Sequence, residues 1–80
     1  MTVRVLLFAR YREAAGSDAL EVAVPQGASL GMVWEAVRDR IPSLRGEGAP
    51  LMALDRAYAT PERSVEGAVE VAFFPPVSGG

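Results

Sequence analysis

A single amphipathic helix is the feature that most constrains the fold of this chain. Ser29 is a suitable N-cap for it, and Pro42 disfavours helical geometry just before the proline, so the helix should end near Arg40. A helix with one apolar face must bury that face against another element, and a β-sheet offers a matching surface. The apolar residues recur at i, i+3, i+4, i+7 and i+11, and we expect all of them in the core: Leu30, Val33, Trp34, Val37 and Ile41.

The segments around this helix predict the sheet. A short helical turn over 10–15, closed by Gly16, separates the first two strands, which should pair antiparallel. The first and last strands are the most apolar, so we expect them side by side and parallel at the sheet centre. The expected strands cover 3–8, 20–24, 51–54, 58–59 and 69–74.

This order of elements predicts an α+β protein of the β-grasp, or ubiquitin-like, class, with a mixed sheet of about four to five strands on one main helix. The domain should cover residues 1–74, and residues 75–80 should form an extended tail. In the last strand, alternation predicts one face toward the core and one toward solvent. The core face should hold Val69, Val71 and Phe73, and the outer face Glu70, Ala72 and Phe74.

Composition narrows the possible functions. The 80 residues include no Cys and no His, which removes thiol and imidazole catalysis and the usual zinc sites, so a self-sufficient enzyme is not expected. A net charge of −2 argues against nucleic-acid binding. Arg38, Arg40 and Arg45 resemble a phosphate-binding patch, but Arg38 and Arg40 close the main helix, where positive charge complements the helix dipole, and we favour that interpretation. No apolar run could cross a bilayer and no leader precedes the first strand, so we expect a soluble, cytoplasmic protein.

The last six residues, Pro75-Pro76-Val77-Ser78-Gly79-Gly80, suit acyl chemistry. The two prolines hold the start of the tail extended, and glycine, lacking Cβ, can thread a narrow channel. The carboxylate of Gly80 has an ordinary pKa of about 3.5, so it is an anion and a poor electrophile until it is activated. Adenylation by an ATP-using partner would activate it. The tail therefore indicates a chain that delivers its terminal carbonyl to another protein.

Both ends of the chain resemble the molybdopterin synthase sulfur carrier subunit family. The run 70–80, Glu-Val-Ala-Phe-Phe-Pro-Pro-Val-Ser-Gly-Gly, is similar to the C-terminus of that family, and the run 3–16 is similar to its opening. The similarity in pattern and length covers essentially the whole chain. The family often has Asn where this chain has Asp55, and both residues suit a turn. It also tends to have an Asp-Gly-Asp turn before the last strand, where this chain has Glu-Gly-Ala-Val over 66–69.

The resemblance implies a mechanism and partners. An adenylating enzyme of the ubiquitin-activating type would activate Gly80 with ATP, with Gly79 beside it, and a persulfide donor would convert it to a thiocarboxylate. The tail would then enter the large subunit of molybdopterin synthase and give its sulfur to cyclic pyranopterin monophosphate. The large subunit would supply the catalytic side chains. This chain would bind no cofactor or metal itself, and neither a membrane nor a nucleic acid would be a partner.

Seven residues are candidates for partner binding. Phe74 would lie on the outer face beside the tail, as an interface residue or buried under a loop. Tyr58 could join the same patch, and Arg12 could pair with an acidic group of a partner or remain solvated. The other four follow Phe74 in the tail: Pro75, Pro76, Val77 and Ser78.

Other functions share the Gly-Gly end. A ubiquitin-like protein modifier would also need Gly80 activated, but its acceptor would be a protein amine. Sulfur carriers for thiamine or for tRNA thiolation also end in Gly-Gly, usually without the Phe-Phe-Pro-Pro run. A plain interaction module would need no terminal chemistry, and deleting Gly80 would then have little effect.

Overall fold

The structure, a computed structural model, describes residues 1–76. Val77, Ser78, Gly79 and Gly80, which complete the expected tail, lie outside the described residues. The elements in chain order are β1 (Thr2–Leu7), α1 (Arg10–Ala15), β2 (Ala19–Ala23), α2 (Leu30–Arg40), the 3-10 helix η1 (Pro42–Leu44), β3 (Leu51–Leu54), β4 (Ala57–Tyr58) and β5 (Glu70–Phe74).

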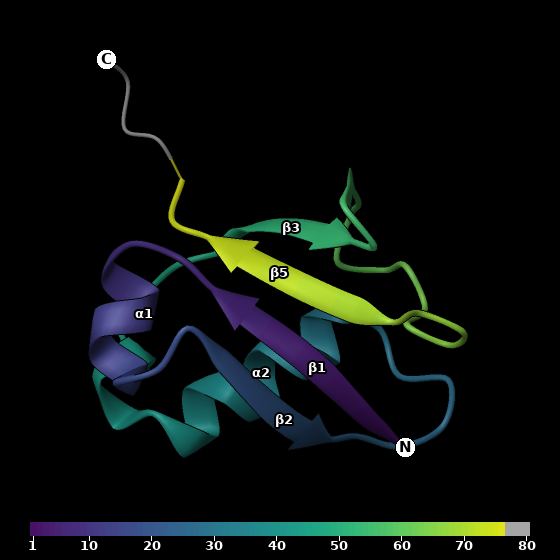
Figure 1. The fold of residues 1–80 in the computed structure, drawn as a ribbon, viewed down its shortest axis with the longest axis horizontal. Helices are drawn as coiled ribbons and strands as arrows, with labels where there is room; N and C mark the ends of the chain where they lie inside the picture. The colour runs from purple at the N-terminus through teal and green to yellow at the C-terminus, as the bar shows by residue number, and fades with distance from the viewer. Residues whose placement is uncertain (77–80) are drawn as a thin grey trace.

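The strands form one mixed sheet in the order β2-β1-β5-β3-β4. β1 and β5 run parallel at its centre, and the pairs β1–β2, β3–β5 and β3–β4 are antiparallel. α2 packs across one face of the sheet and leaves the other face without a helix over it (Figure 1). This is the α+β, β-grasp arrangement, so the fold class and the parallel central pair predicted from the sequence are confirmed.

The core lies between α2 and the inner face of the sheet. All five residues of the predicted helical stripe are buried, including Ile41 just beyond the helix end. The Trp34 ring lies with its centroid 5.0 Å from that of Phe73 on β5 and 5.0 Å from that of Tyr11 on α1. Trp34 is therefore a core residue, as predicted, and it joins the two helices to the central strand.

The predicted helix ends are also confirmed. The Ser29 side chain accepts a hydrogen bond of 3.2 Å from the backbone N–H of Met32, which satisfies one of the free donors of the first turn of α2. Gly16 adopts a left-handed conformation with φ 73° after α1, and its N–H donates to the carbonyl of Arg12 at 3.0 Å. None of the helices formed within residues 1–76 is long and apolar enough to cross a membrane.

The start of β5 corrects one prediction. The strand begins at Glu70, and the Val69 side chain, expected in the core, is 77% exposed. Asp55 explains the difference, because its Oδ1 accepts hydrogen bonds of 2.9 Å from the backbone N–H groups of both Val69 and Glu70. The N–H of Val69 is thus bonded to the β3–β4 turn instead of a neighbouring strand.

Several boundaries differ from the predicted ranges by one residue. β1, β2 and β4 each begin and end one residue earlier than predicted, so Phe8 follows β1 instead of closing it. The connection from α2 to β3 begins with η1. Asp55 suits a turn, as expected, and with Arg56 it forms the two-residue connection of the β3–β4 hairpin, with φ of 46° and 73°.

A candidate docking face beside the C-terminal tail

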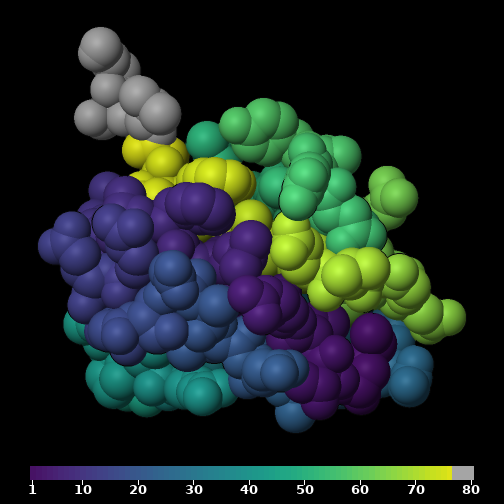
Figure 2. Space-filling model, in the orientation of Figure 1, coloured from purple at the N-terminus to yellow at the C-terminus, as the bar shows by residue number. Residues whose placement is uncertain are grey.

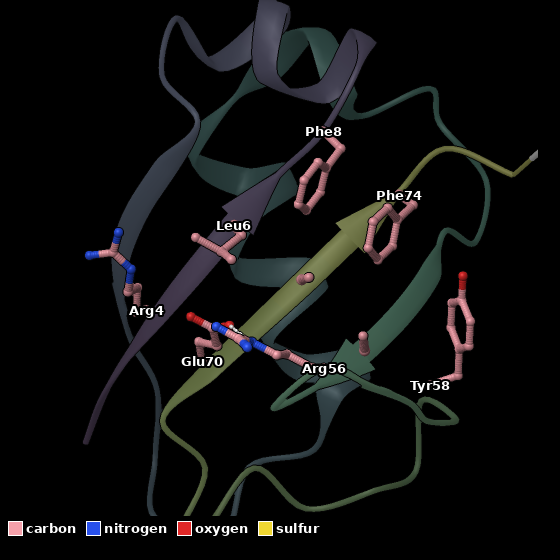
Figure 3. Close-up of a pocket in the computed structure, with 9 residues that line it drawn as sticks. Arg4, Leu6, Phe8, Arg56, Tyr58, Glu70 and Phe74 are labelled. Atoms are coloured by element: carbon pink, nitrogen blue, oxygen red, sulfur yellow. Dashed lines mark ion pairs between the residues drawn. The ribbon is translucent and has the colours of Figure 1, made fainter.

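The candidate site lies on the face of the sheet that α2 does not cover. Side chains alternate along a strand, so the residues between the core positions of β1 and β5 point to this outer face. They surround a hollow of about 490 Å³ over the two central strands and the β3–β4 hairpin. Figure 2 turns this face to the viewer, and Figure 3 shows the residues that line the hollow.

Three aromatic side chains, which we call the aromatic cluster, border the hollow at the end of β5. Phe8 and Phe74 stack with ring centroids 4.5 Å apart and an interplanar angle of 11°. Tyr58 on β4 lies with its ring centroid 6.3 Å from that of Phe74 (Figure 3). Phe8 is 39% exposed and Tyr58 77% exposed, while Phe74 is half-buried by its neighbours. Phe74 therefore lies on the outer face as predicted, and Tyr58 joins the same patch.

The floor of the hollow consists of small or aliphatic side chains. Ala72 on β5 lies between Leu6 on β1 and Ala53 on β3, its partners in the two strand registers. Alanine projects little beyond the backbone, so the middle of the face is lower than its aromatic rim. The arrangement suits an apolar side chain inserted from a partner.

Charged side chains line the opposite end of the hollow from the aromatic cluster. Glu70 on β5 is the register partner of Arg4 on β1, and its Oε1 lies 3.9 Å from Nε of Arg56. The Arg56 side chain is 91% exposed and that of Glu70 is 25% exposed. In Figure 3 Arg56 reaches over β5 to Glu70, whereas Arg4 extends away from Glu70. The outer face thus has an aromatic end and a charged end.

The tail begins at the aromatic end of this face. Pro75 is half-buried and Pro76 exposed, and they follow Phe74 directly. Of the other expected tail residues, Val77, Ser78, Gly79 and Gly80 lie outside the described residues. A partner that holds the aromatic cluster would therefore also hold the start of the tail.

Arg12 lies at the border of the face, on α1. It is exposed, and with Arg4, Phe8 and Asp18 it lines a second, smaller hollow beside the first. Its predicted pairing with an acidic group of a partner stays a prediction.

The arginines at the end of α2 contact backbone carbonyls. Arg40 donates to the carbonyl of Glu21 at 2.7 Å, Arg38 donates to the carbonyl of Arg45, and Arg45 donates to that of Asp39 at 3.4 Å. These contacts give the three side chains a structural role. Within residues 1–76 no group of three potential metal-binding side chains occurs.

The sequence analysis did not identify Phe8 as a site residue. The signal that could have identified Phe8 is the parallel pairing of the first and last strands. The register that pairs Leu7 with Phe73 also places Phe8 beside Phe74. That register could not be derived from the sequence, because it depends on how the long crossover through α2 positions β5 against β1. The small side chains of the floor likewise carry no signal of their own in the sequence.

Comparison with known proteins agrees with the fold. The model of the ThiS family matches residues 5–80. The molybdopterin synthase sulfur carrier subunit of Escherichia coli K12 is 38% identical over 80 residues, which cover 98% of this chain and 99% of that protein. The protein of the same name from Arabidopsis thaliana is 34% identical over 79 residues, which cover 98% of this chain and 82% of that protein.

Among solved structures, the crystal structure of SAMP1 from Haloferax volcanii superimposes with a TM-score of 0.84 and 29% sequence identity, over 100% of both chains. The fold similarity therefore extends over the whole of both proteins. The match of the family model over nearly all of the sequence, together with a relative that is 38% identical over 99% of its own length, shows that this chain belongs to the ThiS family of β-grasp proteins.

Proposed function

We propose that this chain is the sulfur carrier subunit of a molybdopterin synthase. The observation that carries the proposal is the position of the aromatic cluster at the root of a tail whose sequence ends in Gly79-Gly80. The relatives that match at 38% and 34% identity are named sulfur carrier subunits of that synthase, and they are similar to this chain over 98% of its length.

The proposed chemistry takes place at the carboxylate of Gly80. A carboxylate oxygen attacks the α-phosphate of ATP in an adenylating enzyme, pyrophosphate leaves, and the carbonyl becomes an acyl adenylate. The terminal sulfur of a persulfide donor attacks that carbonyl and displaces AMP, which gives an acyl disulfide. A second thiol then attacks the donor's sulfur in this S–S bond, so the donor leaves as a disulfide with that thiol and the thiocarboxylate is released. ATP belongs to the activating enzyme, and this chain supplies the acyl group.

The second half of the cycle takes place in the large subunit. The tail enters its active site, and the thiocarboxylate sulfur bonds to cyclic pyranopterin monophosphate. Water then cleaves the bond between that sulfur and the Gly80 carbonyl and restores the carboxylate. A dithiolene contains two sulfur atoms, so two charged carriers are used for each product. The large subunit supplies the catalytic side chains, and this chain is not an enzyme on its own.

The described residues support this role through docking. The apolar surface of Phe8, Tyr58 and Phe74 suits the desolvated centre of a protein interface. Pro75 and Pro76 restrict the start of the tail, which lowers the entropy lost when the tail is ordered in a partner. Six fully extended residues span at most about 20 Å, so the proposed tail would suit a recessed active site close to the docking face.

A second candidate function is a ubiquitin-like protein modifier. The similarity to SAMP1 of Haloferax volcanii, a protein also described as small archaeal modifier protein 1, favours it. Both functions need an activated Gly80, and they differ in the acceptor, which is a pterin for the carrier and a lysine amine for the modifier. Sulfur carriers for thiamine or tRNA thiolation differ only in the final acceptor.

The test is the intact mass of the protein after incubation with its candidate adenylating enzyme, ATP and a persulfide donor. The carrier role predicts a mass gain equal to the exchange of one oxygen for one sulfur, and a variant lacking Gly80 should show no gain. Addition of the large subunit and cyclic pyranopterin monophosphate should reverse the gain. An unchanged mass with an active enzyme would contradict the proposal, and isopeptide adducts on lysines would favour the modifier.

A further inference from the structure

The charged end of the hollow has an excess of positive charge. Two cationic side chains, Arg4 and Arg56, and one anionic side chain, Glu70, line it, although the whole chain has a net charge of −2. The two arginines differ in their surroundings. Arg4 lies between two register partners of opposite charge, Glu21 on β2 and Glu70 on β5. Arg56, by contrast, belongs to the β3–β4 turn, and Glu70 is the one acidic side chain among the described residues with which it forms an ion pair.

Arg56 is weakly held by the rest of the molecule. Its distance of 3.9 Å to Glu70 is long for an ion pair, and its side chain is 91% exposed. Pairs of this kind between exposed groups contribute about 0–1 kcal/mol to stability, so the guanidinium can change partners at little cost. Its planar fork of donors also suits a bidentate contact with a carboxylate.

The backbone at Arg56 gives a second reason to look for a function. Its φ of 73° is in the left-handed region, at the second position of a two-residue hairpin turn where glycine is preferred. A long side chain there costs conformational energy, and the contacts of Arg56 within the described residues do not offset that cost through packing. Unfavourable backbone geometry of this kind is often found at functional positions.

We propose that Arg56 is a specificity residue of the docking face. The hollow receives an apolar side chain of the partner protein over Leu6, Ala53 and Ala72, and a carboxylate close to that side chain in the partner pairs with Arg56. Arg4, at the rim, adds positive potential. The inference rests on the proposed function in one respect, namely that the partner is a protein that acts on the tail.

The size and lining of the hollow favour this occupant. About 490 Å³ accommodates more than one side chain, and the aromatic cluster and the alanines of the floor favour apolar contact. Apolar contact supplies affinity in such an interface, while a charge at its rim mainly sets orientation and the choice of partner. The carboxylate would fix which way the partner lies along the axis from the aromatic end to the charged end.

The test is a calorimetric titration of this chain with the recombinant large subunit of molybdopterin synthase from the same genome. The titration is done at low salt and at high salt. Arg56→Glu should weaken binding by about tenfold at low salt, with a smaller effect at high salt. Arg56→Lys should retain most of the affinity. Arg63→Glu, which makes the same charge change at an exposed position outside the hollow, should bind like the wild type.

The outcomes separate this inference from the proposed function. If Phe74→Ala weakens binding and Arg56→Glu does not, the specificity role of Arg56 is overturned and the docking face stands. If the wild type does not bind the large subunit, both are overturned, and the thiocarboxylate assay then shows whether a carrier for another acceptor is involved. Circular dichroism of each variant checks that the fold is intact. Arg56→Gly removes the guanidinium at a turn position that glycine suits, so it should also weaken binding without disturbing the turn.

Discussion

Phe8 and Phe74 lie with their rings nearly parallel, 4.5 Å apart between centroids, although 65 residues separate them in the sequence. The parallel pairing of β1 and β5 brings them together, because Leu7 and Phe73 are register partners immediately before them. Phe74 is also the residue before Pro75. The residue that precedes the tail is therefore packed against the ring of the residue that follows β1, which links the start of the tail to the centre of the sheet.

Truncation of Phe74 should separate binding from folding. Phe74 is half-buried on the outer face, so Phe74→Ala should leave the fold intact and weaken binding to the large subunit by about tenfold to a hundredfold, as for an aromatic anchor. Calorimetric titration measures the effect. Met32→Ala is the matched control, since Met32 is 44% exposed but lies on α2, which covers the opposite face of the sheet. Equal affinity of Phe74→Ala and wild type would refute the docking role.

Much of this fold could be predicted because local and long-range signals agree. The stripe on α2 specified a helix with one buried face, and the apolar character of the first and last strands specified their central position. The outward direction of Phe74 followed from alternation along β5. What could not be predicted depends on contacts between distant segments, namely the stacking of Phe8 on Phe74 and the exposure of Val69, which results from a hydrogen bond to Asp55.

Asp55 should be important for stability through its side-chain oxygen. Its Oδ1 accepts two backbone hydrogen bonds of 2.9 Å from the start of β5, and its φ is 46°. Asp55→Ala removes both bonds and places alanine in a left-handed conformation, so the free energy of unfolding should fall by about 1–3 kcal/mol. Asp55→Asn keeps a side-chain oxygen and tolerates this conformation, so it should be close to wild type.

Urea unfolding of the two Asp55 variants measures these differences. Hydrogen exchange at the amides of Val69 and Glu70 gives a local readout, because these are the donors to Asp55. Their protection should fall in Asp55→Ala and persist in Asp55→Asn. Equal stability of Asp55→Ala and wild type would show that water replaces the carboxylate without loss.

The ion pair of Arg10 and Glu47 should make stability depend on pH. Arg10 donates from Nε and Nη2 to both carboxylate oxygens of Glu47, at 2.9–3.3 Å. This hydrogen bonding, followed by the attraction of the guanidinium charge, holds the pKa of Glu47 below its ordinary value of 4.5. A lowered pKa in the folded state means that the stabilisation is present above pH 4.5 and is lost as the pH falls through the folded-state pKa.

Glu47→Gln should therefore have a lower melting temperature than wild type at neutral pH, and the difference should vanish well below pH 4.5. Added salt should also reduce it, because the groups are at the surface. Glu62→Gln makes the same change at another exposed position and serves as the control. If the difference in melting temperature between Glu47→Gln and wild type stays constant across this pH range, the ion pair is not its cause. The difference would then come from a packing contact of Glu47 that the amide does not make.

The hydroxyl group of Tyr11 should be dispensable for folding. The side chain is fully buried against Trp34, and its oxygen has no hydrogen-bond partner among the described residues. A buried hydroxyl without a partner keeps its desolvation cost, so Tyr11→Phe should leave the free energy of unfolding unchanged or raise it by about 1 kcal/mol at neutral pH.

Burial, and secondarily the charge of Glu47, raises the pKa of Tyr11 above 10.0, while Arg10 lowers it in part. Wild type should accordingly lose stability as the pH rises from 10.0 through the folded-state pKa, because the unfolded chain ionises first, and Tyr11→Phe should lose less. Urea unfolding of both proteins at neutral pH and above pH 10.0 makes the comparison. If Tyr11→Phe is clearly less stable than wild type at neutral pH, the hydroxyl has a partner in solution and the predicted gain at high pH should be absent as well.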